Sequence, residues 1–267
     1  MEDANSYIRK VTGKNKGYPG AQPIVLDPKK SYNFSTFYIA NKFDGERMLV
    51  FGWNNKSYQM DRKGTIQQIL FFVRNGDVFD TEKVNQDYYI LDFIAENEKV
   101  LDLPFYKRIR LFLSIKSYSK SNLKPKLFLD FKKQNEKILE KERKKLKQPF
   151  EGYIFTVKTT PVTFITTSDI LKWKPLELNT VDFLYKDGKL FVGTKNGLVE
   201  RGKFIGTGTG NDVKIENGQI IECKPGLFKD TWEFFRFRND KTKPNFITVY
   251  NSTFKTIQNF KPLEFPI

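Results

Sequence analysis

Residues 42–47 read Lys-Phe-Asp-Gly-Glu-Arg and stand between two short β-like runs, 35–40 and 47–53. A lysine at a strand end, followed by a carboxylate, a glycine and an arginine, would suit a nucleophile in phosphate chemistry. Arg47 would then lie close enough to hold a phosphate or a ribose. The same residues could equally form a surface hairpin turn. Taken alone, this segment leaves both interpretations open.

A second segment carries two cations at alternate positions. Lys172 and Lys174 flank Trp173. Residues two apart in a strand face the same way, so both ammonium groups would project together while Trp173 points into a core. Like charges on one face repel unless an anion such as a nucleotide phosphate lies between them. The alternative is an exposed edge strand protected by lysines.

A third segment, Trp232 to Lys241, repeats this pattern with arginine. Arg236 and Arg238 share a predicted strand face, and Lys241 follows just beyond. These cations would suit the outer phosphates of a triphosphate, since a guanidinium can bind phosphate through two hydrogen bonds. The alternative is a basic strand that faces nucleic acid without a catalytic role.

Composition narrows the chemistry that these residues can perform. The 267-residue chain has no histidine and one cysteine, Cys223, which excludes Ser-His-Asp and Cys-His nucleophiles, histidine-containing metal sites and disulfides within the chain. Cys223 lies in an apolar run and is expected to be a buried core residue. A net charge of +15 suits a polyphosphate or nucleic-acid partner. The carboxylates beside β-like runs that could bind Mg²⁺ or a ribose hydroxyl are Glu82, Asp92 and Glu151.

The pattern of elements predicts a chain dominated by short strands. Turn-forming pairs at 187–188, 196–197 and 217–218 predict a compact set of hairpins, as in a small barrel. Helices are predicted over 131–147 and 248–260; the first is highly charged and is either a solvated helix or an RNA-binding face. The N-terminus does not resemble a signal peptide, and no apolar run reaches 18 residues, so we expect a soluble intracellular protein.

Taken in order, these segments resemble the motifs of the covalent nucleotidyltransferases, which include capping guanylyltransferases and ATP-dependent ligases. The chain is most similar to the capping guanylyltransferases, because Tyr18–Pro23, Asp169–Pro175 and Trp232–Lys241 match their patterns. The similarity extends from about Gly17 to Asn245. It implies an α+β fold: a nucleotidyltransferase domain of antiparallel sheets with helices (1–177), a β-barrel OB-fold (178–248), and a C-terminal helix that packs back on the chain (249–267).

The resemblance also implies a reaction. Lys42 would attack the α-phosphate of GTP, release pyrophosphate, and pass the resulting lysyl-GMP to the 5′-diphosphate end of RNA to give GpppN. Neighbouring cations would lower the pKa of Lys42, because a protonated lysine is not a nucleophile. Leu91 stands where an aromatic residue commonly stacks on the base. The resemblance also implies which group each other residue would bind. Lys172 and Lys174 would bind the α-phosphate, Arg47 the nucleotide, Arg62 and Glu82 the ribose, Lys126 the guanine O6, and Glu151 a Mg²⁺ or Mn²⁺ ion. Arg236, Arg238 and Lys241 would bind the outer phosphates, with Asp240 orienting them.

The expected partners follow from this reaction. They are GTP, diphosphate-ended RNA, a separate RNA triphosphatase and a separate cap methyltransferase, with an RNA polymerase as a further candidate and no membrane. A cellular protein of this kind would be expected in the nucleus. A viral one would be expected in the cytoplasm, in a virion or in a viral factory. Two other functions stay open at this point: an ATP-dependent polynucleotide ligase, which attaches AMP, and an RNA-binding OB module on an inactive nucleotidyltransferase shell.

Overall fold

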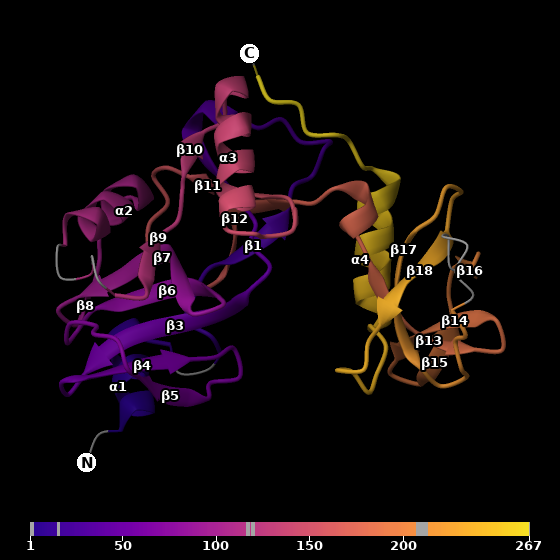
Figure 1. The fold of residues 1–267 in the computed structure, drawn as a ribbon, viewed down its shortest axis with the longest axis horizontal. Helices are drawn as coiled ribbons and strands as arrows, with labels where there is room; N and C mark the ends of the chain where they lie inside the picture. Colours follow the sequence, from indigo (N-terminus) through magenta and orange to yellow (C-terminus); the bar gives the residue numbers. More distant parts are fainter. Residues whose placement is uncertain (1–2, 15–16, 116–117, 119–120, 207–212, 267) are drawn as a thin grey trace. The chain divides into compact units, whose positions relative to one another are not determined.

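A computed structural model describes residues 3–14, 17–115, 118, 121–206 and 213–266 of the chain (Figure 1). The chain divides into two compact units. The first comprises residues 1–26, 32–173 and 264–267, and the second comprises 27–31 and 174–263. This division falls close to the expected boundary at residue 177. Whether the units are independent folding domains with the bounds 1–177, 178–248 and 249–267 stays a prediction.

Two mostly antiparallel sheets build the first unit. The larger has the order β5-β4-β3-β6-β7-β8, with β9 parallel to β7, and the smaller has the order β1-β12-β11-β2-β10, with β1 parallel to β12. The strands are β1 (Gln22–Val25), β2 (Phe37–Asn41), β3 (Glu46–Trp53), β4 (Lys56–Met60), β5 (Ile66–Ile69), β6 (Val78–Val84), β7 (Asp87–Glu96), β8 (Lys99–Val100), β9 (Leu123–Pro125), β10 (Leu129–Asp130), β11 (Tyr153–Val157) and β12 (Thr166–Trp173).

The larger sheet is buried on both faces by two helices that the sequence did not predict. Side chains of β3 alternate between two core clusters, with Met48 and Val50 in one and Leu49 and Phe51 in the other, as the two-residue period of a strand requires. Helix α2 (Phe105–Ser114) contributes Phe112 to the first cluster, and helix α1 (Ala4–Thr12) contributes Tyr7 and Ile8 to the second. Both faces of the sheet therefore contribute to hydrophobic cores of the first unit.

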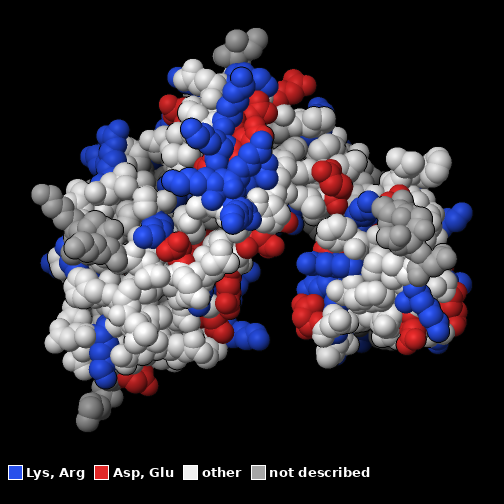
Figure 2. Space-filling view, in the orientation of Figure 1, with Lys and Arg blue, Asp and Glu red and all other residues white. Residues whose placement is uncertain are grey.

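Helix α3 (Lys133–Lys145) packs against β2 of the smaller sheet. It is the predicted charged helix, and Figure 2 shows Lys and Arg side chains gathered over its position in Figure 1. Its buried side carries Leu139, which is fully buried. The short 3₁₀ helix η1 (Phe34–Thr36) precedes β2. Near the C-terminus, Phe265 packs against Phe131 and Tyr153, so this tail belongs to the first unit.

In its described residues, the second unit has a six-stranded, mainly antiparallel sheet and one α-helix, consistent with an OB-fold. Its order is β15-β14-β13-β17-β18-β16. Asp187 and Gly188 both adopt positive φ in the β13–β14 turn, which confirms the predicted hairpin. The elements are η3 (Leu176–Leu178), β13 (Val181–Lys186), β14 (Lys189–Thr194), β15 (Gly197–Glu200), β16 (Lys203–Phe204), β17 (Ile220–Pro225), β18 (Thr231–Phe237) and α4 (Ile247–Gln258).

The core of this unit includes Cys223, Trp232 and, from α4, Tyr250. Cys223 is fully buried in this core, which confirms the predicted core position, and burial raises the pKa of its thiol well above the usual range. The predicted C-terminal helix packs on the sheet of its own unit through Tyr250, and it ends at Gln258. None of the helices in the described part of the chain is long and apolar enough to cross a bilayer.

Candidate active site

The candidate nucleophile, Lys42, directly follows β2, in the short segment that connects β2 of the smaller sheet to β3 of the larger sheet. The Lys42 amide donates to the carbonyl of Gly152 at 2.9 Å and so continues the pairing of β2 with β11. The chain then turns at Gly45, where a Cβ atom would lie 2.5 Å from the carbonyl oxygen of Lys83. The tight approach requires glycine there. Segment 42–47 is thus a link between the two sheets and not a solvated hairpin turn.

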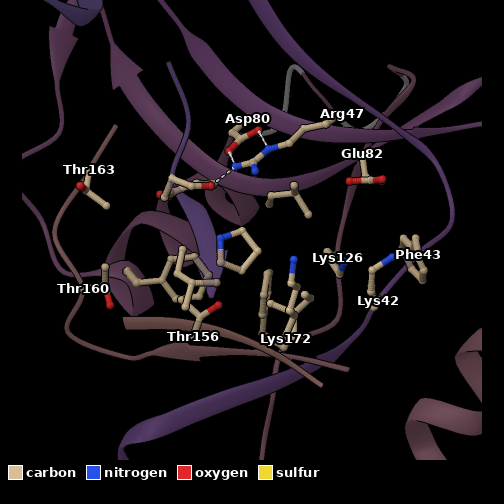
Figure 3. Close-up of a pocket in the computed structure, with 18 of the residues that line it drawn as sticks. Lys42, Phe43, Arg47, Asp80, Glu82, Lys126, Thr156, Thr160, Thr163 and Lys172 are labelled. Atoms are coloured by element: carbon tan, nitrogen blue, oxygen red, sulfur yellow. Dashed lines mark hydrogen bonds and ion pairs between the residues drawn. The ribbon is translucent and has the colours of Figure 1, made fainter. Parts of the chain in front are cut away.

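Lys42 lines a pocket of about 430 Å³ formed within the first unit (Figure 3). This volume lies within the usual range for small-molecule sites. Both sheets supply the walls. Lys172 lies in β12 of the smaller sheet and Lys42 directly follows its strand β2, while Arg47 and Glu82 come from the larger sheet. The charged lining residues are Lys42, Glu46, Arg47, Arg62, Asp80, Glu82, Asp92, Arg108, Lys126 and Lys172, and the large apolar ones are Phe43, Leu91, Phe105, Phe128, Ile154 and Ile170.

Arg47 is held by a carboxylate that sequence reasoning missed. Its Nε donates to Oδ1 of Asp80 at 2.9 Å, while Nη2 donates to the other oxygen of Asp80 and to the carbonyl of Ala21. The hydroxyl of Tyr18 also donates to Asp80, at 2.9 Å. Burial, and then the charge of Asp80, raise the pKa of Tyr18. Of the three guanidinium nitrogens of Arg47, only Nη1 has no hydrogen-bond partner among the described residues. That edge of the guanidinium is therefore the one left for a ligand.

Lys126 is buried beside the nucleophile segment. Its Nζ lies 4.4 Å from the centroid of the Phe43 ring, and the residue is only 5% exposed. Burial lowers the pKa of Lys126 to about 8, against the opposing charges of Glu82 and Glu142. Burial also raises the pKa of Glu82, against the charges of Lys126 and Lys42. Lys126 and Glu82, both predicted site residues, are therefore neighbours in one partly desolvated cluster.

The structure separates Lys172 from Lys174. Lys172 lies in β12 and lines the pocket; its pKa is lowered by burial and then by the charges of Lys42 and Arg62. The interpretation that both lysines share a strand face was wrong, because β12 ends at Trp173 and Lys174 precedes Pro175 in the second unit. Lys174 is not among the residues that line the pocket. Its role toward the α-phosphate stays a prediction.

The two remaining predicted residues of the first unit lie at the edges of this site. Arg62 lines the pocket, and its Nη2 donates to Oε1 of Gln22 at 2.8 Å. An oxygen of Glu151 lies 4.0 Å from Lys42 Nζ, and its side chain is 20% exposed. No group of three or more acidic or cysteine side chains in the described residues is arranged to hold a metal. Mg²⁺ commonly uses one or two carboxylates together with substrate phosphates, so Glu151 alone is compatible with such an ion.

The apolar end of the pocket supplies aromatic rings in place of the missing aromatic at position 91. Phe105 and Phe128 line the pocket with their ring centroids 5.0 Å apart, and Leu91 lies in the same wall. Arg108, which also lines the pocket, is almost fully buried and holds Asp92 through two hydrogen bonds of 2.7 Å. Asp92 therefore has a structural partner, while Phe105 and Phe128 remain available to contact a base.

One polar atom at this end has no partner. Thr160 is 3% exposed, and its hydroxyl makes no hydrogen bond within the described residues. It lines the pocket, as Thr156 and Thr163 also do (Figure 3). A buried hydroxyl without a partner is unfavourable, which makes Thr160 a candidate to bind a ligand or an ordered water.

The second unit holds the predicted basic cluster, and three carboxylates neutralise it. Arg238 and Lys241 both pair with the buried carboxylate of Asp182, at 2.7 Å for Arg238. The Nε of Arg236 donates to Oε2 of Glu222 at 2.6 Å. Arg238 also binds Asp240 through two hydrogen bonds and thereby lowers the pKa of Asp240 to about 2. Three cations are thus matched by three anions. These ion pairs fix the orientation of the Arg236, Arg238 and Lys241 side chains and leave little net positive charge in the cluster.

Sequence patterns pointed toward some of the residues that were missed. Asp80 lies two positions before Glu82 in β6, and the period of a strand places both on one face. Asp182 stands in the run that follows the Lys172 segment. No local pattern indicated Glu222 or Thr160, because their importance depends on contacts between distant segments.

The chain matches two families over most of its length. The mRNA capping enzyme catalytic domain matches residues 2–176, and the mRNA capping enzyme C-terminal domain matches residues 189–260. The mRNA-capping enzyme subunit alpha of Schizosaccharomyces pombe is 23% identical over 94% of this chain and 80% of its own length. The mRNA-capping enzymes of Caenorhabditis elegans and Mus musculus are 26% and 25% identical over 94% and 92% of this chain. This chain covers 49% and 48% of those two proteins, or about half of their length.

Solved structures share the fold at lower sequence identity. A mycobacterial DNA ligase D complexed with ATP and MES has a TM-score of 0.50 and 13% identity over 83% of this chain and 94% of that chain. This likeness shows that the two proteins share a fold. Because the catalytic-domain family matches more than half of the chain, this protein belongs to the mRNA-capping enzyme family, and it is a guanylyltransferase of the nucleotidyltransferase class.

Proposed function

We propose that Lys42 carries GMP as a covalent intermediate between GTP and RNA. In the first step, Lys42 Nζ forms a bond to the α-phosphorus, the bond to the bridging oxygen breaks, and pyrophosphate leaves. The attacking nitrogen must be neutral and gives up a proton as the phosphoramidate forms. In the second step, an oxygen of the RNA 5′-diphosphate attacks the same phosphorus, the P–N bond breaks, and the lysine nitrogen regains a proton.

One observation carries this proposal: Lys42 and Lys172 line the same pocket as the aromatic pair Phe105 and Phe128. The cationic end would bind and orient the α-phosphate, and the apolar end would hold the purine by stacking and burial. Lys172 is charge-coupled to Lys42 and would stabilise the negative charge that develops on the phosphorus oxygens.

The other pocket residues support narrower roles. Glu82 would accept a hydrogen bond from a ribose hydroxyl, and Arg62 would donate to one. The free Nη1 of Arg47 would reach the nucleotide while Asp80 fixes its plane. Lys126, cationic at neutral pH, would donate to guanine O6. Glu151 would hold Mg²⁺ or Mn²⁺, which supplies Lewis-acid stabilisation of the phosphate charge.

The wider partners belong to the same proposal. The acceptor is diphosphate-ended RNA, and a separate triphosphatase and methyltransferase complete the cap, in the nucleus of a cell or in the cytoplasm for a viral protein. Triphosphate-ended RNA should then fail as an acceptor with this chain alone. Full capping of such RNA by the purified chain would contradict this assignment of partners.

The test is label transfer from α-labelled GTP, and separately from ATP, to the purified protein with a divalent metal. Wild type and Lys42→Arg are compared under denaturing conditions. Label from GTP alone, absent in Lys42→Arg, is the expected result. Label from ATP alone would identify a ligase, and label retained in Lys42→Arg would exclude Lys42 as the nucleophile.

A further inference from the structure

Helix α3 presents a row of lysines that the catalytic site does not use. Lys137, Lys141 and Lys145 are exposed and follow one another at four-residue intervals, which places them on one face, about 6 Å apart along the helix axis. Within the described part of the chain, none of the three makes an ion pair or hydrogen bond. We call Lys137, Lys141 and Lys145 the lysine stripe.

The ion pairs that the acidic residues of α3 form go to lysines outside this stripe. Glu136 pairs with Lys133 at 2.8 Å, and Glu140 pairs with Lys144 at 2.6 Å. Glu142 is turned inward, where its carboxylate accepts a hydrogen bond from Asn41 at 2.7 Å. The outer surface is left strongly cationic, and Figure 2 shows Lys and Arg side chains crowded at this position.

Helix stability does not account for the stripe. Cations in the last turn, such as Lys145, are favourable to the helix dipole, but Lys137 and Lys141 lie before the last turn, where this effect has faded. Like charges four residues apart repel each other and weaken the helix. The arrangement therefore costs stability unless an anion is bound.

The opposite face of the same helix supports the nucleophile segment. Asn41, the residue before Lys42, donates to the carbonyl of Leu139 at 2.7 Å as well as to Glu142. Leu146, just after the helix, packs against the hydrophobic cluster that contains Phe43, the residue after Lys42. One helix thus connects an exposed cationic row to the strand end that carries the nucleophile.

We propose that the lysine stripe binds the phosphate backbone of the acceptor RNA downstream of its 5′ end. This inference rests on the proposed function, because it assumes an RNA acceptor. A row of evenly spaced, unpaired cations suits successive phosphates without reading bases. The stripe would raise the local concentration of long RNA at the enzyme without taking part in the chemistry.

The experiment compares wild type with the triple variant Lys137→Gln, Lys141→Gln, Lys145→Gln. A matched control carries Lys10→Gln, Lys56→Gln and Lys99→Gln, three exposed lysines elsewhere on the first unit. GMP loading from GTP is measured first; it should be the same in all three proteins. Unchanged loading shows that the variants are folded and keeps this test separate from the proposed function.

Affinity for a 20-nucleotide diphosphate-ended RNA is then measured between 50 and 200 mM salt. Losing three phosphate contacts should reduce the slope of log K against log salt by about 2, at about 0.7 per contact on a single strand. The wild type should therefore lose about 18-fold more affinity over this range than the stripe variant. GMP transfer to a three-nucleotide acceptor should not change.

Three results would overturn the proposal, and the first two concern the salt slope. One is an equal salt slope in the stripe variant and wild type; the other is an equal loss in the control variant, which would mean that any three positive charges act alike. Binding of a phosphorylated peptide that needs the stripe, with RNA affinity unaffected, would also overturn it and assign the surface to a protein partner.

Discussion

Lys126 provides the sharpest prediction, because its burial costs stability at neutral pH. A lysine in the unfolded chain titrates near 10.5, whereas burial lowers the pKa of Lys126 to about 8. Between these values the unfolded chain binds a proton that the folded chain has released, so stability rises with pH. The difference between the two values corresponds to roughly 3 kcal/mol in all, of which about 1 kcal/mol is recovered between pH 7 and 9.

The perturbation is Lys126→Met, which keeps a long apolar stem and removes the charge. The free energy of unfolding of wild type should gain about 1 kcal/mol relative to the variant between pH 7 and 9. Urea unfolding at several pH values measures this difference. Lys124→Met is the control, because Lys124 is only half-buried and its Nζ binds the carbonyl of Ser121 at 3.0 Å.

The same variant tests the role of Lys126 toward guanine. If its ammonium group donates to O6, Lys126→Met should load GMP less well than wild type at pH 7, and this difference should shrink above pH 8 as Lys126 loses its proton. If the free energy of unfolding changes with pH in the same way in wild type and in Lys126→Met, the reasoning about the buried charge is refuted. Full GMP loading by the variant would refute the contact with guanine.

Three further substitutions test other contacts. Asp80→Asn should lower the free energy of unfolding by about 3–5 kcal/mol, because it leaves the largely buried charge of Arg47 without its carboxylate. Tyr18→Phe, which removes one hydrogen bond to Asp80, is the control and should cost ~1 kcal/mol. Equal losses for the two variants in urea unfolding would contradict this prediction. Thr160→Val should weaken GTP binding about tenfold by calorimetry and leave the apo protein at least as stable, whereas unchanged affinity would exclude the hydroxyl as a ligand contact. Asp182→Asn should slow GMP loading by releasing Arg238 and Lys241, and unchanged loading kinetics would separate this cluster from the reaction.

The strands and the two predicted helices could be read from the sequence because their signals are local. β-Branched and aromatic runs define β2, β3, β7 and β11, and the Asp187-Gly188 pair defines a hairpin by its backbone requirement alone. The helices α1 and α2 were missed. Both are short, and α2 begins after Pro104 without a side-chain cap, so its formation depends on packing Phe112 against the larger sheet.

The candidate site was predictable where residue type and spacing determine the chemistry. Lys42, Lys172, Glu82 and Lys126 lie together as the resemblance implied, although those roles stay predictions. The partners that fix these side chains were not predictable, since pairs such as Arg47 with Asp80 join residues 33 positions apart. Lys174 was predicted to share a strand face with Lys172. That prediction failed because β12 ends at Trp173, and side chains alternate between two faces only within a strand.

The central claim is that Lys42 itself bears GMP, and intact-protein mass spectrometry tests it most directly. The protein is incubated with GTP and a divalent metal, weighed, digested and sequenced, with Lys42→Arg in parallel. We predict a mass increase of one GMP residue, located on Lys42, that disappears when diphosphate-ended RNA is added and is absent from Lys42→Arg. An adduct on another residue, or GMP transfer to RNA without any adduct, would contradict the account.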